Sequence, residues 1–200
     1  MATKQQTDTL MEWDAREIAR KGVLTSELEL ERAVWAERSL NLLSEEQPNL
    51  EVLRKEIFNM IVQYESLHWS DSDTITKNQI AESDRAERQV KKEFSFFRKR
   101  KESILSKLKK YGLNQNDLAV ILAHRKSYVS ELLNGIRAFS MNDIIIMHKL
   151  FDIQLEDLVF TEIPVETEKR IKEALEKTVS NSSKTKKPAQ VTSLVKALYS

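Results

Sequence analysis

The chain has 200 residues, of which 40% are hydrophobic and 32% charged, and its formal net charge at pH 7 is +1. This size and composition allow one medium domain or two small ones with a modest core. The absence of Cys excludes disulfides, thiolate nucleophiles and zinc–thiolate sites, and only three Gly and three Pro argue for helices over strands. No apolar run is long enough for a membrane span and the N-terminus lacks a signal-peptide layout, so we expect a soluble, cytoplasmic protein.

The charges are segregated along the chain. Residues 1–90 carry eleven Lys and Arg against eighteen Asp and Glu, a net charge of −7, whereas residues 91–137 carry twelve against four, a net charge of +8. Such segregation indicates a basic face for a polyanion and an acidic part with a different role. Helices that merely alternate in charge are the other interpretation.

The N-terminal third predicts three helices. A short helix runs from residue 8 to about residue 20 and ends at Gly22, and Thr25 or Ser26 can cap a second helix over 27–44. A third helix begins after Pro48 and Asn49, and its apolar residues recur every three or four positions as far as residue 67. We expect the second and third helices to form an antiparallel hairpin around the buried sides of Trp35 and Phe58.

A polar hinge over residues 70–78 precedes a charged helix over about 81–100, which is typical of a connection between two units. The aromatic cluster of Phe94, Phe96 and Phe97 is expected to begin the next core.

Five short helices are predicted over the next sixty residues. The first covers 102–108 and closes at Gly112, and Asn114 caps the second, whose Leu118 and Leu122 face the core. The third covers 126–133 and ends at Asn134-Gly135. Its apolar residues predict burial of Val129, Leu132 and Leu133, and further apolar residues at 144, 150, 151, 153, 155 and 158 indicate the last two helices.

After Pro164, the segment VETEKRIKEALEKTV predicts a polar helix. The Ser- and Lys-rich segment from residue 180 to 190 is expected to be disordered, and the last residues could form one or two helical turns on a partner.

Residues 98–160 resemble the helix-turn-helix domain of the Cro/repressor (XRE) family. The matching residues are Gly112, Asn114, Gln115, Leu118, Ala119, Leu122, Ser127, Tyr128, Val129, Ser130, Asn134, Gly135 and Arg137. Ala123 stands where a Gly is usual. Together with the helices predicted above, the resemblance gives an expected all-α fold, in which an N-terminal helical hairpin and a linker helix precede a five-helix lambda-repressor-like domain and a partly disordered C-terminal tail. The expected domains are an N-terminal helix (1–22), an acidic hairpin (23–69), a hinge with the linker helix (70–97), the helix-turn-helix domain (98–160) and a polar helix with a flexible tail (161–200).

The resemblance also implies the site residues. The expected DNA contacts are Gln115, Arg125, Lys126, Ser127, Tyr128, Ser130, Glu131 and Arg137. The expected phosphate contacts are Lys99, Arg100, Lys101, Lys107, Lys109 and Lys110. Glu131 repels phosphate, so it must either accept a hydrogen bond from cytosine or face away from the DNA.

The run YVSELLNGIRAFSMNDIIIMHKLFDI resembles antitoxins of the HigA type, which implies three partners: a double-stranded DNA operator, a small basic toxin ribonuclease and a second copy of the chain. A phage- or mobile-element-type repressor without a toxin partner, and a protein-interaction adaptor that has lost DNA binding, are the alternatives. The three His are far apart and no glycine-rich phosphate loop is present, so we expect no catalytic residue, metal or cofactor.

Overall fold

A computed structural model describes residues 14–71, 73–163 and 165–181. These residues form nine helices and no strand, which confirms the all-α fold class. The chain divides into two compact units, Met1–Phe160 and Thr161–Ser200. Residues 8–13 of the first expected helix and residues 182–200 of the expected tail lie outside the described residues. No helix in the described part is both long and apolar enough to cross a membrane.

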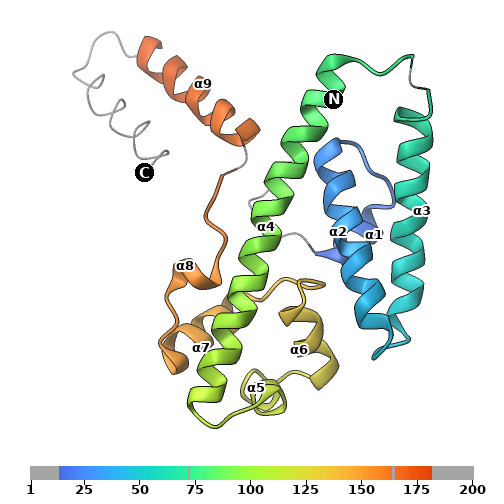
Figure 1. The fold of residues 1–200 in the computed structure, drawn as a ribbon. Helices are drawn as coiled ribbons and strands as arrows, with labels where there is room; N and C mark the ends of the chain where they lie inside the picture. Colours follow the sequence, from blue (N-terminus) through green and yellow to red (C-terminus); the bar gives the residue numbers. More distant parts are fainter. Residues whose placement is uncertain (1–13, 72, 164, 182–200) are drawn as a thin grey trace, which may run out of the picture. The chain divides into compact units, whose positions relative to one another are not determined.

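Three helices make up the N-terminal part of the first unit: α1 (Ala15–Lys21), α2 (Glu27–Ser44) and α3 (Leu50–His68) (Figure 1). Asp14 caps α1 and Gly22 closes it with a φ of 74°. The hydroxyl of Ser26 caps α2 by accepting a hydrogen bond from the Glu29 amide at 3.3 Å. The bounds of α2 and its Ser26 cap therefore agree with the prediction.

The helices α2 and α3 pack together through one apolar face on each. The buried residues include Leu30, Ala33, Leu40, Leu50, Leu53, Ile57 and Tyr64. The expectation for Phe58 is wrong, because its side chain is 49% exposed. One residue turns a helix by about 100°, so burial of Ile57 directs Phe58 away from α2. Trp35 is half-buried and stacks on Phe94 with 4.1 Å between ring centroids.

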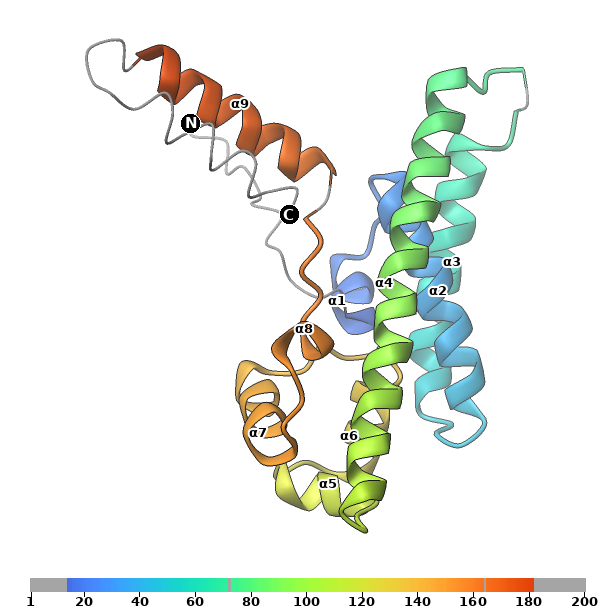
Figure 2. The same cartoon turned by 60° about the vertical axis from the view of Figure 1, so that its left-hand side comes forward.

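A single helix, α4 (Lys77–Lys110), runs past both groups of helices (Figures 1 and 2). The prediction of one helix over 81–100 and another over 102–108 is wrong, because the sequence has no Gly or Pro between residues 77 and 110 to interrupt it. Phe97 packs into the N-terminal core, whereas Ile104 and Leu108 pack into a second core. The expected domain boundary at residue 98 therefore lies inside one helix.

The second core is enclosed by α4, α5 (Gln115–Ile121), α6 (Lys126–Leu133), α7 (Met141–Phe151) and α8 (Leu155–Leu158). Its buried residues include Leu118, Leu122, Val129, Leu132, Ile144, Met147, Phe151, Ile153 and Leu158. Five helices thus surround this core, as predicted, although Leu150 and Leu155 are exposed rather than buried.

The second unit contains α9 (Val165–Asn181). This helix confirms the one predicted after Pro164 and extends two residues into the segment expected to be disordered. Its side chains at Ile171 and Leu175 are half-buried.

Candidate nucleic-acid interface

The interface is built on α5, α6 and the turn between them. Asn114 and Asp117 form a reciprocal capping box at the start of α5, because each side chain accepts a hydrogen bond from the other's backbone amide. The turn closes where the His124 amide donates to the Ala119 carbonyl at 2.9 Å. Ala123 has a φ of 55°, the left-handed conformation that favours glycine, which explains why Ala is unusual at this place.

The turn is held against the rest of the domain by a polar contact. His124 Nε2 lies 3.0 Å from Oδ1 of Asp143 in the first turn of α7. The same carboxylate accepts hydrogen bonds from the amide and hydroxyl of Ser140, which caps α7. One buried acid therefore fixes both the turn before α6 and the start of α7.

The helix α6 has one buried face and one that reaches solvent. Val129, Leu132 and Leu133 are buried, as predicted. Lys126 and Ser127 are exposed and Ser130 is half-buried, while Arg125 is exposed immediately before the helix. Lys126 and Ser130 are one turn apart, so they lie on the same side of α6.

Two other expected contacts, Tyr128 and Arg137, lie together at the edge of this surface. The Tyr128 ring packs on His124 with 4.6 Å between centroids, and the Arg137 guanidinium lies 4.6 Å from the Tyr128 ring centroid. Both residues are half-buried. Gln115 is half-buried in the first turn of α5.

Glu131 does not reach the surface of α6. Its side chain is buried, with 4% of the residue exposed, and its Oε2 accepts hydrogen bonds from Arg137 Nε at 2.7 Å and from Arg16 Nη2 at 3.0 Å. Of the two expectations for Glu131, the base contact is wrong and the side chain faces away from the surface, because two guanidiniums already hold its carboxylate.

The six expected phosphate contacts divide into exposed and engaged residues. Lys99, Lys109 and Lys110 are exposed, whereas Lys101 donates to Asn134 Oδ1 at 2.8 Å and Lys107 to the Asp152 carbonyl at 2.7 Å. The expectation for Arg100 is wrong: only 2% of this residue is exposed, and its guanidinium lies over the Phe139 ring and donates to the Leu158 carbonyl.

These lysines do not form one face. The turn of about 100° per residue separates Lys101 from Lys99 and Lys110 by roughly 160–180° around α4, with Lys107 and Lys109 between them on opposite sides. The hydrogen bond from Lys101 to Asn134 identifies its flank as the one beside the end of α6. The available cations on the α6 side of the domain are therefore fewer than the sequence suggested.

Two residues that structure the site were not predicted as such. Asn134 donates from Nδ2 to the Ser130 carbonyl at 2.7 Å and so links the exposed side of α6 to Lys101. The Asn134-Gly135 pair predicted only that the helix ends there, and not that the Asn134 side chain makes these contacts. Arg16 is 115 residues from Glu131, and no local pattern connects them.

Comparison with known families agrees with this geometry. Residues 104–158 match the family model described as Helix-turn-helix, so this segment is a helix-turn-helix domain of the Cro/C1 type. Searches among curated proteins and among solved structures found no match. Among the described residues, no group of three or more His, Asp and Glu side chains could hold a metal ion.

Proposed function

We propose that this chain is a sequence-specific, double-stranded-DNA-binding transcription regulator. The observation that carries the proposal is a helix-turn-helix domain at 104–158 in which α6 presents Lys126, Ser127 and Ser130 to solvent directly after Arg125. An α-helix fits the major groove of DNA, and the first turns of the second helix of this motif are the part that reaches base edges.

Each exposed group has chemistry suited to DNA. Lys and Arg donate to guanine O6 and N7, Ser reaches base edges or phosphate, and Gln can form two hydrogen bonds with adenine. We assign base contacts to Lys126, Ser127 and Ser130, with Gln115 and Arg125 at the rim. Lys109, which is exposed near the end of α4, is assigned to phosphate, which adds affinity without sequence preference.

The test is DNA affinity at fixed salt, measured by fluorescence anisotropy with the duplex upstream of this protein's own gene and with a random-sequence duplex. Arg125→Ala with Lys126→Ala should weaken binding by at least about tenfold, since each such contact contributes roughly 1–3 kcal/mol. Lys169→Ala with Arg170→Ala removes the same two residue types from exposed positions on α9 and is the matched control. Equal affinity of the two double variants would reject the proposal.

We propose a homodimer as the DNA-binding form, because a two-fold protein matches two half-sites about one helical turn apart. Exposed apolar side chains on α7 and α8, including Met141, Ile145 and Leu155, support an interface between copies. Light scattering of the free chain and footprinting on its operator test this. A monomeric complex on a single half-site would contradict it.

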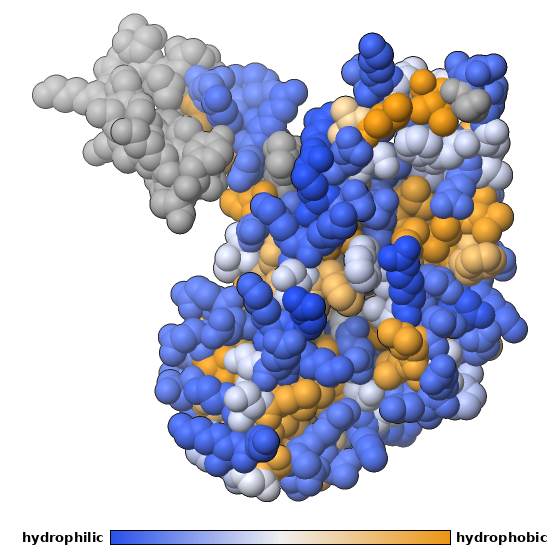
Figure 3. All heavy atoms as spheres, viewed as in Figure 1, coloured by the Kyte–Doolittle hydropathy of each residue, from blue (hydrophilic) through white to orange (hydrophobic). Residues whose placement is uncertain are grey.

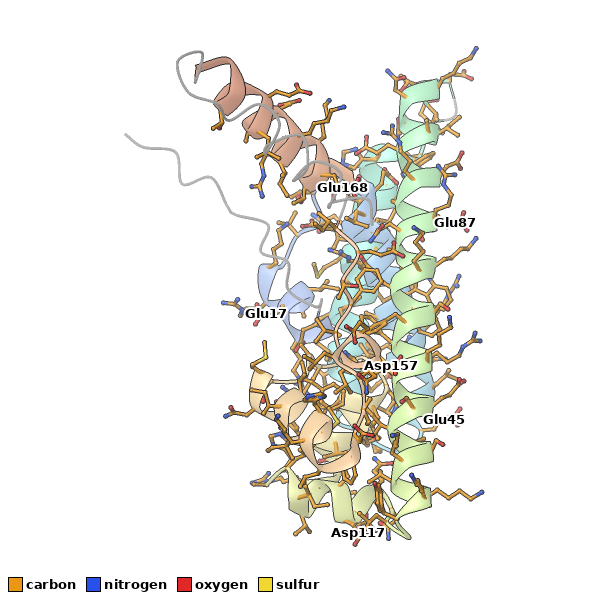
Figure 4. The ribbon with its side chains drawn as sticks, turned by 90° about the vertical axis from the view of Figure 1, so that its left-hand side faces the viewer. Glu17, Glu45, Glu87, Asp117, Asp157 and Glu168 are labelled. Carbon is orange, nitrogen blue, oxygen red and sulfur yellow. The ribbon has the colours of Figure 1, made fainter. Side chains whose placement is uncertain are left out.

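The finer role we propose is that of an antitoxin that binds a small basic toxin ribonuclease and represses its own operon. Its support is the acidic first 90 residues, since a basic RNA-binding partner would be attracted to them. Exposed acids include Glu17 on α1, Glu45 just after α2 and Glu87 on α4 (Figure 4). Apolar side chains gather over α3, which carries exposed Val52, Phe58 and Val62 (Figure 3).

Expression of the neighbouring gene tests the antitoxin role. A short basic protein that arrests growth alone, and is tolerated when this chain is expressed with it, is the expected result. If the neighbouring genes encode no such protein, DNA binding would stand and the chain would be a repressor without a toxin.

A further inference from the structure

The helix α1 is fastened to the end of the DNA-recognition segment. The Ala15 amide donates to the Ile136 carbonyl at 3.1 Å, and the Asp14 carboxylate accepts from the Ala138 amide at 3.4 Å. Ala15 and Ile136 are both fully buried. The loop that follows α6 is therefore held by a helix that belongs to the N-terminal core, where Ile18 and Ala19 also pack.

The strongest contact across this junction is a charge cluster. Glu131 is the only acid on α6, and Arg16 donates to its Oε2 from both Nε, at 3.2 Å, and Nη2, at 3.0 Å. Arg137 donates to the same oxygen and lies on the Tyr128 ring. Two guanidiniums thus share one buried carboxylate, and the cluster carries a net charge of +1.

This arrangement matters for a polyanion. A carboxylate on a helix that enters the groove repels phosphate and opposes the attraction that supplies most DNA affinity. Arg137 alone would cancel the charge of Glu131, but the pair would then have no net positive charge to attract phosphate. Because Arg16 supplies a second guanidinium from outside the helix-turn-helix domain, the cluster remains cationic and Arg137 stays ordered on Tyr128.

We propose that Arg16 is a positioning residue for DNA binding. It neutralises the charge of Glu131 and fixes the loop after α6, so that α1 contributes to DNA binding although it lies outside the helix-turn-helix domain. Displacement of α1, by a partner of the N-terminal helices for example, then lowers DNA affinity. The inference rests on the proposed DNA-binding function and adds to it a coupling between the acidic helices and the recognition helix.

The test uses the full chain and three variants. Arg16→Gln should weaken binding to the upstream duplex on the order of threefold, the effect of one unit charge about a Debye length from phosphate at protein-surface dielectric. Arg16→Lys retains the charge and should bind nearly as tightly as the wild type. Arg16→Gln with Glu131→Gln removes the acid as well and should restore most of the lost affinity.

The double variant separates charge neutralisation from a role in folding. Both variants lack the ion pair between Arg16 and Glu131, but only the single variant keeps the negative charge of Glu131. Unchanged affinity of Arg16→Gln, or a double variant as weak as the single one, would overturn the inference. Thermal unfolding of each variant identifies any that is not folded, and Arg16→Lys then provides the comparison.

Amide exchange in the absence of DNA provides a second, independent readout. Arg16→Gln should speed exchange in the segment from residue 134 to 139 and leave α7 unchanged; equal protection there would overturn the docking role. If the wild type itself shows no salt-sensitive affinity for either duplex, the proposed function fails, whereas this exchange measurement still decides whether Arg16 holds the loop.

Discussion

Loss of the ion pair between α2 and α4 should destabilise the first unit strongly. Arg32 holds the Glu93 carboxylate through two hydrogen bonds, from Nε to Oε2 at 3.0 Å and from Nη2 to Oε1 at 2.7 Å. Gln89 donates to the same carboxylate at 3.1 Å. The Glu93 side chain is 3% exposed and that of Arg32 is 22% exposed, so Arg32→Met leaves a buried carboxylate with one neutral donor.

The magnitude follows from that geometry. Removing one partner of a buried pair costs about 3–5 kcal/mol, and the partial exposure of Arg32 lowers this to about 2–3 kcal/mol because water can reach the carboxylate. For a unit of this size the corresponding fall in Tm is roughly 5–10 °C. Replacing both partners by Met should recover most of the loss, since an apolar pair carries no desolvation penalty.

Urea unfolding monitored by Trp fluorescence measures these changes, because Trp35 stacks on Phe94 beside the ion pair. Arg20→Met is the matched control: it removes an Arg that pairs with Glu17 at the exposed surface, where stability should not change measurably. A cost of less than about 1 kcal/mol for Arg32→Met, or a double Met variant as unstable as the single one, would contradict this role of the ion pair.

Three further substitutions test other contacts. Tyr64→Phe should destabilise by about 1.5–3 kcal/mol, since the Tyr64 hydroxyl donates to the buried Glu27 carboxylate at 3.0 Å; no loss by denaturant titration would contradict this. Ala123→Gly should stabilise by roughly 0.5–1 kcal/mol, because relief of the left-handed strain exceeds the added chain entropy, and a lower Tm would count against it. Burial, with nearby Glu87 and Glu27, raises the pKa of Glu31 above its ordinary value of 4.5, so the native state favours the protonated form and loses stability as pH rises through that range. Glu31→Gln should therefore raise Tm at neutral pH but not well below pH 4.5, and an equal gain at both would be inconsistent with this cause.

Local signals in the sequence predicted much of the fold. The bounds of α2 and α6, the caps at Ser26 and Asn114 and the buried residues of α6 follow from helical periodicity and from hydroxyl or amide side chains placed before an apolar run. These features depend on residues within about one helical turn of each other, so a short stretch of sequence is enough to predict them.

The errors at Phe58, Arg100 and Glu131 have a different origin. Phe58 lies one residue from a buried position, and which of two adjacent apolar residues faces the partner helix depends on how the helices pack. Arg100 and Glu131 were expected at the DNA surface because the resemblance places Glu131 on the recognition helix and Arg100 beside the motif. Arg100 is buried against Leu158, 58 residues away, and Glu131 against Arg16, 115 residues away. Pairings over such distances produce no periodic pattern in the sequence.

The salt dependence of DNA affinity tests the central claim most directly. For duplex DNA the logarithm of the binding constant falls with the logarithm of salt concentration, with a slope of about 0.9 for each phosphate neutralised. We expect a steep slope for the wild type, and one shallower by about 0.9 for Lys109→Ala, because Lys109 is the residue assigned to phosphate. A wild-type affinity that does not change with salt would contradict DNA binding, and a Lys109→Ala variant with the wild-type slope would contradict its phosphate contact.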